Sequence, residues 1–243
     1  MVSGAISDIG KNREKNQDAY YASSDRDFPL YFVADGMGGH RSGEVASTMA
    51  MDIIKNEFLL FKSNLNKEKN ILKVIKESIE KANTKIYLKS IESEECNGMG
   101  TTITLGYIFE SKIFIGHVGD SRAYLIRDKE IFQITEDHSY VNELLKLGSI
   151  SIEEAKKHPK KNMITRAVGS SSTISMDLIV KEYEEDDILL LCSDGLFNML
   201  SEREIYEVFN REKNLQKACE ILVKKANENG GLDNITLVSI KFN

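Results

Sequence analysis

The stretch LYFVADGMGGH, residues 30–40, decides the fold of this chain. Its first five residues are apolar and rich in β-forming side chains, and Asp35-Gly36 follows directly. Such a run predicts a short buried strand, which we expect to stop at Asp35-Gly36. A carboxylate next to a buried strand is costly unless water, a charged partner or a metal ion compensates it. The side chain of Asp35 is therefore the first candidate for a functional group.

The segments on either side of this strand show two different spacings of apolar residues. Residues 44–61 and 68–91 have the helical spacing and predict two amphipathic helices. The apolar stripe of the first would hold Val45, Met49, Ile53 and Leu60, and that of the second Ile71, Val74, Ile75, Ile79, Ala82 and Ile86. Two further helices are predicted near the end of the chain, one opened by Ser201-x-x-Glu204 and one over 215–229. Strands are predicted at 19–21, 101–109, 112–118, 123–127, 130–134, 174–183, 188–191 and 235–242.

The order of these elements is strand, two helices, strands, two helices, strand. That order fits a layered α+β fold better than alternating βαβ units. Residues 139–162 interrupt it with short helical patterns, a Ser151-x-x-Glu154 capping box and Pro159. We interpret this segment as a short helical flap inserted between sheet elements. Because no repeat or low-complexity segment divides the chain, we expect residues 1–243 to form one domain.

Composition excludes several classes of protein. The net charge is −6, whereas a protein that binds nucleic acid usually has a basic surplus or a basic stripe. The three cysteines lack CxxC spacing, so neither a disulfide framework nor a zinc site is indicated. No apolar run approaches the roughly 18 residues of a membrane helix, and no signal peptide is recognisable. We therefore expect a cytoplasmic protein with neither nucleic acid nor membrane as its partner.

Four other aspartates, like Asp35, adjoin predicted strands: Asp18, Asp120, Asp194 and Asp233. Any one Asp-Gly pair after a strand is usually only a turn. Several carboxylates that converge without basic partners would repel one another, and divalent cations would relieve that repulsion. Oxygen ligands favour Mg²⁺ or Mn²⁺ over zinc. The residues alone thus indicate a metal-dependent hydrolase and leave its substrate open.

The chain carries eight ordered motifs: Arg13-x-x-Asn16-Gln17-Asp18, Asp35-Gly36-Met37-Gly38-Gly39-His40, Gly98-Met99-Gly100-Thr101-Thr102, Gly119-Asp120-Ser121-Arg122, Asp137-His138-Ser139, Thr165-Arg166-Ala167-Val168-Gly169, Ser193-Asp194-Gly195-Leu196 and Asp233-Asn234-Ile235-Thr236. In this set and order the sequence resembles the bacterial branch of the type 2C metal-dependent protein phosphatases, the PPM family. The resemblance extends from Ile6 to Val238. It implies an αββα sandwich of two antiparallel sheets flanked by helices, with a metal site at one end, and a single catalytic domain.

The resemblance also implies roles for individual residues. Asp35 would bridge two core ions of Mn²⁺ or Mg²⁺, and the carbonyl of Gly36 would help to hold the second. Asp194 and Asp233 would complete the ligands of the first ion, and Asp18 would act through bound water. Asp120, together with Asp194, would hold a third and weaker ion. Arg13 would bind the substrate phosphate through its bidentate guanidinium, so that Arg13, Asp35 and Asp194 are the expected catalytic residues.

The reaction expected from this arrangement is hydrolysis of phosphoserine and phosphothreonine on proteins. Two cations that share a water lower its pKa and neutralise the phosphate oxygens during direct attack. Many eukaryotic relatives have a histidine where this chain has Met37, so the proton donor to the leaving group stays open between metal-bound water and a residue such as His40. The other histidines, His117 and His138, we expect to be structural hydrogen-bonding residues.

Two alternatives differ in class. One is a two-metal hydrolase of small phosphate esters or nucleic acid. The acidic balance of the chain argues against nucleic acid as its substrate. The other is a pseudophosphatase that only binds a partner, which we disfavour because every metal-position aspartate is present. The resemblance further implies phosphorylated proteins as partners, including a bacterial Ser/Thr kinase that the enzyme opposes, and a monomeric state.

Overall fold

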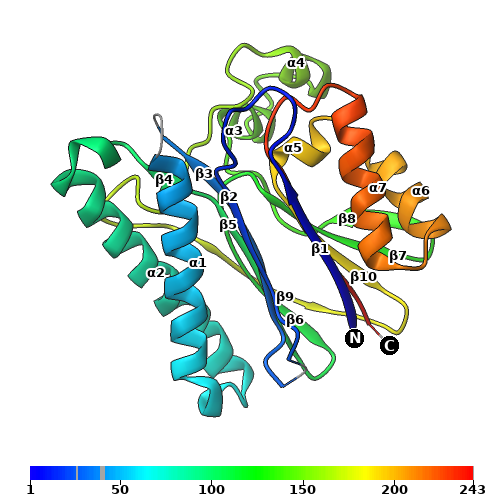
Figure 1. Cartoon of the computed structure of the whole chain (residues 1–243), viewed down its shortest axis with the longest axis horizontal. Helices are drawn as coiled ribbons and strands as arrows, with labels where there is room; N and C mark the ends of the chain where they lie inside the picture. Colours follow the sequence, from blue (N-terminus) through cyan, green and yellow to red (C-terminus); the bar gives the residue numbers. More distant parts are fainter. Residues whose placement is uncertain (26, 39–41, 243) are drawn as a thin grey trace.

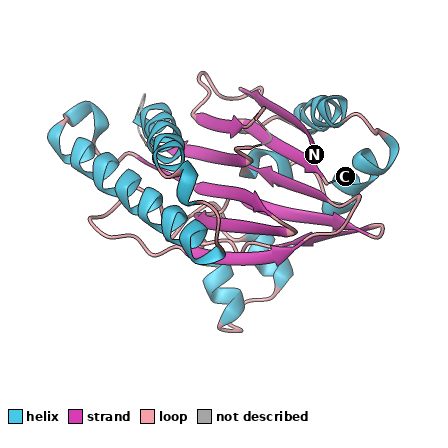
Figure 2. Ribbon diagram, turned by 90° about the horizontal axis from the view of Figure 1, so that it is seen from below, coloured by secondary structure: helices cyan, strands magenta, loops and turns pink. Residues whose placement is uncertain are grey.

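Two antiparallel β-sheets stacked face to face form the centre of the molecule (Figures 1 and 2). The computed structural model describes residues 1–25, 27–38 and 42–242. The first sheet has the order β1 (Val2–Asp8), β11 (Ile235–Lys241), β10 (Ile188–Cys192), β7 (Arg122–Arg127) and β8 (Glu130–Gln133). The second has the order β2 (Asp18–Ala22), β3 (Leu30–Met37), β5 (Ile103–Phe109), β6 (Lys112–Val118) and β9 (Asp177–Glu182), with β4 (Gly100–Thr101) paired to β3.

Helices cover the outer face of each sheet, as Figure 1 shows. The helices α1 (Ser42–Leu60) and α2 (Glu68–Glu92) pack on the second sheet, and α6 (Glu202–Arg211) and α7 (Leu215–Glu228) pack on the first. Short 3₁₀ turns lie at Lys62–Asn64 and Glu94–Cys96. A third apolar cluster fills the space between the sheets. The layers are therefore helix, sheet, sheet, helix, which confirms the expected αββα sandwich.

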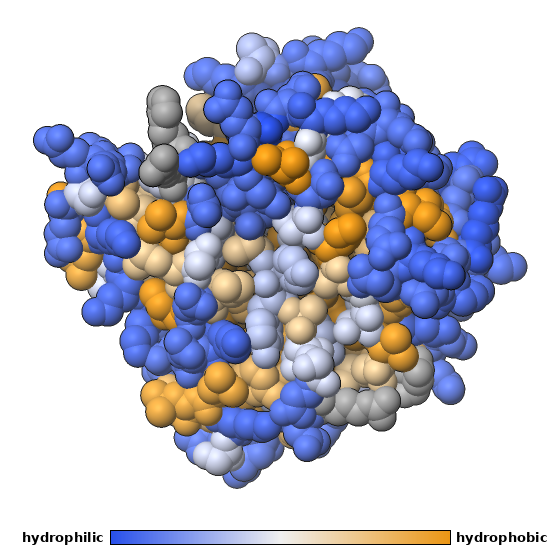
Figure 3. Space-filling view, viewed as in Figure 1, coloured by the Kyte–Doolittle hydropathy of each residue, from blue (hydrophilic) through white to orange (hydrophobic). Residues whose placement is uncertain are grey.

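The surface on the side of the molecule seen in Figure 3 follows the same layering. In Figure 3 the outer surfaces of the helices are largely hydrophilic, while paler and hydrophobic residues show between α1 and α7, over β1 and β2. None of the described helices is long and apolar enough to cross a membrane. All three cysteines are buried free thiols.

The apolar stripe of α2 was predicted correctly and that of α1 was not. All six predicted residues of the α2 stripe are buried: Ile71, Val74, Ile75, Ile79, Ala82 and Ile86. In α1 the buried line is Ala46, Ala50, Ile54 and Phe58, while Leu60 is 69% exposed. The two small alanines let α1 approach the sheet closely, so that the larger predicted residues flank the contact and only partly pack against it.

Strand β3 does not stop at Asp35-Gly36 as predicted but continues to Met37. Neighbouring strands still pair with it there: Asp18 lies opposite Asp35, and Gly36 lies opposite Thr101. The predicted strand 101–109 is interrupted at Thr102, whose hydroxyl accepts a hydrogen bond from the Asp35 amide at 2.9 Å. The sheet thus extends along Asp35 and fixes the backbone of this residue on both sides.

Two further elements also differ from the prediction. The predicted strand 174–183 begins only at Asp177, because Ile174 and Met176 pack against the helix-side core outside the sheet. The four-residue helix α5 (Asp194–Phe197) was not predicted, since one turn is too short to show a helical period. Asp194 is therefore the first residue of a helix.

The predicted flap is present as two short helices, α3 (Tyr140–Lys146) and α4 (Ile152–Lys157). The hydroxyl of Ser139 accepts a hydrogen bond from the amide of Asn142 and begins α3. The predicted capping box of Ser151 and Glu154 begins α4. The flap therefore has its own local start signals, which is why the sequence pattern located it.

Candidate metal centre

The structure brings the predicted metal-site residues together at one end of the sandwich. A cavity of about 230 Å³ is lined by Arg13, Asp35, Gly36, Asp120, Asp194 and Asp233, among other residues. Asp18 begins β2 directly opposite Asp35 in the strand pairing. Apart from Asp35 and Gly36, which are neighbours in β3, these residues come from different strand ends or loops, so only the folded sandwich assembles the group.

Two glycines explain why the backbone can converge there. A Cβ atom at Gly36 would lie 2.1 Å from the carbonyl oxygen of Gly43 in α1, so the position must stay bare for the strand and helix to meet. Gly119, at the end of β6, has a φ of +109°, which few residues other than glycine adopt. This turn places Asp120 at the cavity instead of along the strand.

Burial disfavours the charged form of these carboxylates and so raises their pKa values. Burial, together with neighbouring Asp233, raises the pKa of Asp18 to about 6. Burial, with nearby Asp137, raises the pKa of Asp120 to about 6. The pKa values of Asp35 and Asp194 lie well above their usual range, first through burial and then through the surrounding aspartates.

The donor set fits divalent cations. Among the described residues, the buried Oδ1 atoms of Asp18 and Asp194 have no hydrogen-bond partner, which is a costly arrangement unless a cation binds there. Among the described residues that line this cavity, Arg13 carries the only guanidinium or ammonium group, against four aspartates. Oxygen donors of this kind suit Mg²⁺ and Mn²⁺. No three described His, Cys, Asp or Glu side chains already surround one point as a closed site, so donor chemistry and the orphaned oxygens carry this conclusion.

Arg13 has a contact that the sequence did not reveal. Its Nη2 donates a hydrogen bond to Oδ2 of Asp233 at 2.6 Å. The sequence analysis placed Arg13 on the phosphate alone, apart from the metal ligands. The structure instead couples its guanidinium to one of the expected ligands.

Several supporting residues also escaped the sequence analysis. The Asn234 side chain accepts a hydrogen bond from the Gln17 amide and donates to the carbonyls of Ile9 and Lys15, and it thereby ties the loop that carries Arg13 to β11. Asn234 lies in a quoted motif, so its position was a usable signal. Asn162 lines the cavity from the flap, and no motif marked it.

Two further carboxylate oxygens are held by direct hydrogen bonds. The hydroxyl of Ser193 donates to Oδ2 of Asp18 at 2.8 Å. The side-chain amide of Asn198, the C-cap residue of α5, donates to Oδ2 of Asp194 at 3.0 Å. In each aspartate one oxygen is therefore oriented by the protein, and the other is the orphaned Oδ1.

The histidines are structural, as expected for His117 and His138. The buried His117 lies between the Thr104 hydroxyl and the Glu136 carbonyl, and burial lowers its pKa to about 4. His138 accepts a hydrogen bond from the Gly119 amide through Nδ1, and burial also lowers its pKa. Met37 lines the metal cavity, whereas His40 lies outside the described residues.

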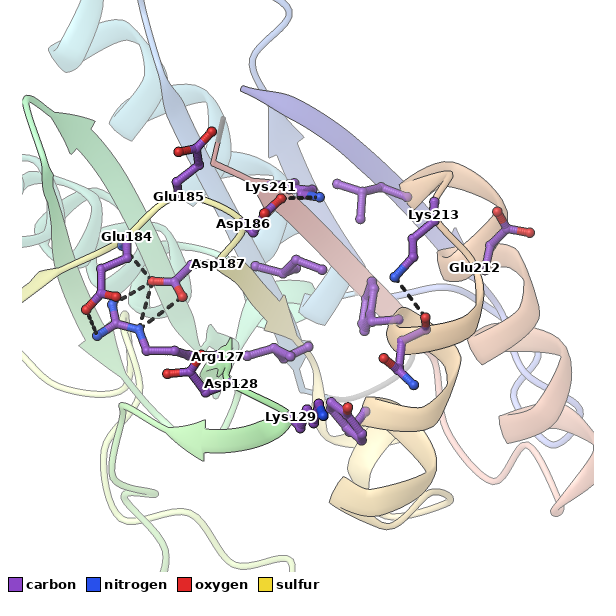
Figure 4. A pocket seen from close by; sticks show the side chains of 16 residues that line it. Arg127, Asp128, Lys129, Glu184, Glu185, Asp186, Asp187, Glu212, Lys213 and Lys241 are labelled. Carbon is purple, nitrogen blue, oxygen red and sulfur yellow. Dashed lines mark hydrogen bonds and ion pairs between the residues drawn. The ribbon is translucent and has the colours of Figure 1, made fainter.

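A larger cavity, of about 610 Å³, lies elsewhere, between the β7–β8 turn, the loop before β10 and the end of α6 (Figure 4). Three of its acidic side chains have basic partners: Asp187 and Glu184 pair with Arg127 at 2.6 and 2.8 Å, and Asp186 pairs with Lys241 at 2.7 Å. Lys129 and Lys213 also line this space, so basic residues accompany its other acidic ones. The smaller cavity has four aspartates and only Arg13 as a basic residue among its described lining, and it is therefore the candidate metal centre.

The fold and the site together define a metal-dependent hydrolase built on an αββα sandwich. Residues 10–227 match the family model described as Protein phosphatase 2C. The serine/threonine phosphatase Stp of Listeria monocytogenes is 40% identical over 235 residues, covering 96% of this chain and 93% of the relative. The protein phosphatase PhpP of Streptococcus pneumoniae is 39% identical over 246 residues, covering 100% of this chain and 98% of PhpP.

Solved structures agree with this assignment. The S. agalactiae serine/threonine phosphatase superposes with a TM-score of 0.94 at 40% identity, over 100% of this chain and 99% of that one. The catalytic domain of PstP, solved in complex with two manganese ions, gives a TM-score of 0.86 at 31% identity, over 100% and 98% of the two chains. The chain belongs to the protein phosphatase 2C family of metal-dependent serine/threonine phosphatases.

Proposed function

We propose that this enzyme removes phosphate from phosphoserine and phosphothreonine on proteins by direct attack of water, and that it opposes a bacterial Ser/Thr kinase. The observation that carries the proposal is the group of buried aspartates with orphaned oxygens, faced by one guanidinium. The names of the relatives, which are serine/threonine phosphatases, support the substrate class.

The aspartates would divide the cations between them. Asp35 and the Gly36 carbonyl would hold two core ions of Mn²⁺ or Mg²⁺, with Asp194 and Asp233 on the first ion and Asp18 acting through water. Asp120, with Asp194, would hold a third and weaker ion. Bound divalent cations lower the pKa of a water and neutralise phosphate charge.

The side chains around the cavity would position the substrate. Arg13 would bind two phosphate oxygens with its planar fork. Its ion pair with Asp233 already holds the guanidinium at the cavity wall, which reduces the freedom lost on binding. Met37 has no proton to transfer and His40 lies outside the described residues, so no side chain is assigned as general acid.

The proposal extends to the domain organisation, location and partners of the enzyme. We infer that residues 1–243 form one catalytic domain that acts as a cytoplasmic monomer, with phosphorylated proteins as partners and a Ser/Thr kinase among them. The nearly complete coverage of relatives of similar length supports the single domain.

The test compares a phosphothreonine peptide with a small aryl phosphate and with a nucleic acid, in Mn²⁺ and after metal removal with EDTA. We expect Mn²⁺-dependent release of phosphate from the peptide and no cleavage of nucleic acid. Full peptide turnover in excess EDTA would contradict the metal mechanism. Turnover of the aryl phosphate alone would favour the alternative, a hydrolase of small esters.

A further inference from the structure

A second cavity, of about 500 Å³, continues from the metal centre beneath the flap. It shares Asp120, Asn162 and Asp194 with the smaller cavity, so the two spaces adjoin along these residues. Its volume lies in the range of ligand sites, about 300–1,000 Å³. A phosphate group bound at the cations would leave this second space for the rest of the substrate. We call the space the flap groove.

Two apolar walls face each other across the flap groove. Val141 and Leu145 lie one turn apart in α3 and therefore on the same side of that helix, and Ile152 joins them from α4. Ile152 is 67% exposed in a structure that buries most large apolar side chains. On the other side Phe197 in α5 lines the groove. These walls can accept an apolar side chain and remove it from water.

The positive charge beside Phe197 belongs to Arg122, which already has partners within the protein. The guanidinium carbon of Arg122 lies 3.8 Å from the centre of the Phe197 ring. Its Nε and Nη2 donate to the Asp137 carboxylate at 2.7–3.1 Å, and its Nη1 donates to the Tyr124 hydroxyl. Arg122 therefore braces the wall and neutralises Asp137 without offering free charge to a ligand.

The available positive charge lies on the flap. Lys156, one turn after Ile152 in α4, lines the groove with a 68% exposed side chain and only a 3.6 Å contact to the exposed Glu153. Lys161 also lines the groove and has no ion pair within the described residues. With Asp137 neutralised, the flap rim presents two ammonium groups, while the uncompensated carboxylates lie at the metal end. The groove thus combines apolar walls with a cationic rim.

We propose that the flap groove selects phosphoprotein segments that carry one large apolar side chain near the phosphorylated residue and an acidic residue beside it. The apolar side chain would lie between Ile152 and Phe197, and the acidic one would face Lys156 and Lys161. Continuity with the metal centre and the charge of the rim identify the occupant as substrate. The inference rests on the proposed function and specifies the substrate sequences that the same site prefers.

The first experiment measures kcat/KM on phosphothreonine peptides with an alanine-based host sequence. A single leucine is moved through the five positions on either side of the phosphothreonine, because an extended chain advances about 3.3–3.6 Å per residue and the groove adjoins the metal centre. We expect one position to raise kcat/KM about tenfold or more over the host peptide. A neighbouring glutamate should raise it a further ~3-fold relative to lysine.

Matched variants then test the named residues. For each enzyme the compared quantity is the ratio of its own kcat/KM values on two peptides. Ile152→Gln should bring the leucine peptide to within about twofold of the host, and Lys156→Glu should make the lysine peptide better than the glutamate peptide. Lys157→Glu is the control, since Lys157 is an exposed residue of the same helix that does not line the groove. It should retain both preferences.

The outcomes separate the two proposals. Equal turnover of all peptides by the wild-type enzyme, or preferences that survive in Ile152→Gln and Lys156→Glu, would overturn the flap groove and leave the proposed function standing. Hydrolysis of a small aryl phosphate with no turnover of any phosphopeptide would overturn the proposed function itself.

Discussion

Replacing Asp18 with asparagine should stabilise the protein when metal is absent. The side chain is buried, its Oδ1 has no hydrogen-bond partner within the described residues, and its Oδ2 accepts from the Ser193 hydroxyl at 2.8 Å. Asn retains an acceptor for Ser193 and carries no negative charge for the neighbouring Asp233 to repel. The substitution therefore removes a repelled charge while keeping the hydrogen bond and the volume.

The pKa of Asp18 sets the size of the effect. It rises from 3.8 to about 6 in the folded protein, and about 1.36 kcal/mol per pKa unit makes this about 3 kcal/mol of unfolding free energy at pH 7. The folded state holds the proton more tightly than the unfolded state does. The wild-type protein therefore loses this stability as pH rises from about 4 to about 6. Asp18→Asn should lack that loss, with a Tm higher by about 6–12 °C at pH 7.

The assay is denaturant unfolding in excess EDTA at a series of pH values from 4 to 8. The difference between Asp18→Asn and wild type should be small at pH 4, grow up to about pH 6 and then stay constant. Added Mn²⁺ should stabilise the wild type more than the variant, because the variant has lost an anion at the site.

A surface aspartate provides the control. Asp25 is exposed, and the Asp27 amide and Lys62 lower its pKa, so its charge is favourable where it lies. Asp25→Asn should give no gain at any pH. If Asp18→Asn proves no more stable than wild type at pH 7, or if its gain is the same at pH 4, the repulsion argument is wrong.

Three other predictions follow from the site and its surroundings. Arg13→Ala should raise KM for a phosphopeptide about 10- to 150-fold and tighten Mn²⁺ binding, because the 2.6 Å ion pair with Asp233 is lost; an unchanged KM would remove Arg13 from the phosphate. Asp120→Ala should lower kcat and abolish only the weakest Mn²⁺ binding in a calorimetric titration, and normal turnover with unchanged stoichiometry would exclude a third ion there. The pKa of His117 falls from 6.5 to about 4 in the folded protein. As pH falls from 6.5 to 4, the wild type should therefore lose about 3 kcal/mol of unfolding free energy relative to His117→Gln, measured by denaturant unfolding.

The sequence predicted the layers and most of the site because both depend on local signals. A buried strand can be recognised from its apolar run, and α2 can be recognised from six apolar residues on one stripe. The aspartates were found because each adjoins such a strand. The resemblance to a family then assigned their roles, which the charges alone left open.

What the sequence missed depends on packing between distant segments. The stripe of α1 was misplaced because alanine carries little apolar signal, although Ala46 and Ala50 are fully buried in the core beneath α1. The ion pair of Arg13 joins residues 220 positions apart, and no local spacing encodes such a contact. Asn162 enters the cavity only because the flap folds over it.

The position of β11 has a consequence for the synthesis of the enzyme. This C-terminal strand lies between β1 and β10 in the middle of its sheet, and Asp233 directly precedes it. A nascent chain on the ribosome therefore exposes the unpaired edges of β1 and β10 until residue 241 has emerged. Sheet closure and delivery of Asp233 therefore occur in the same step, and we expect no dephosphorylation by a growing polypeptide before residues 233–241 have left the ribosome.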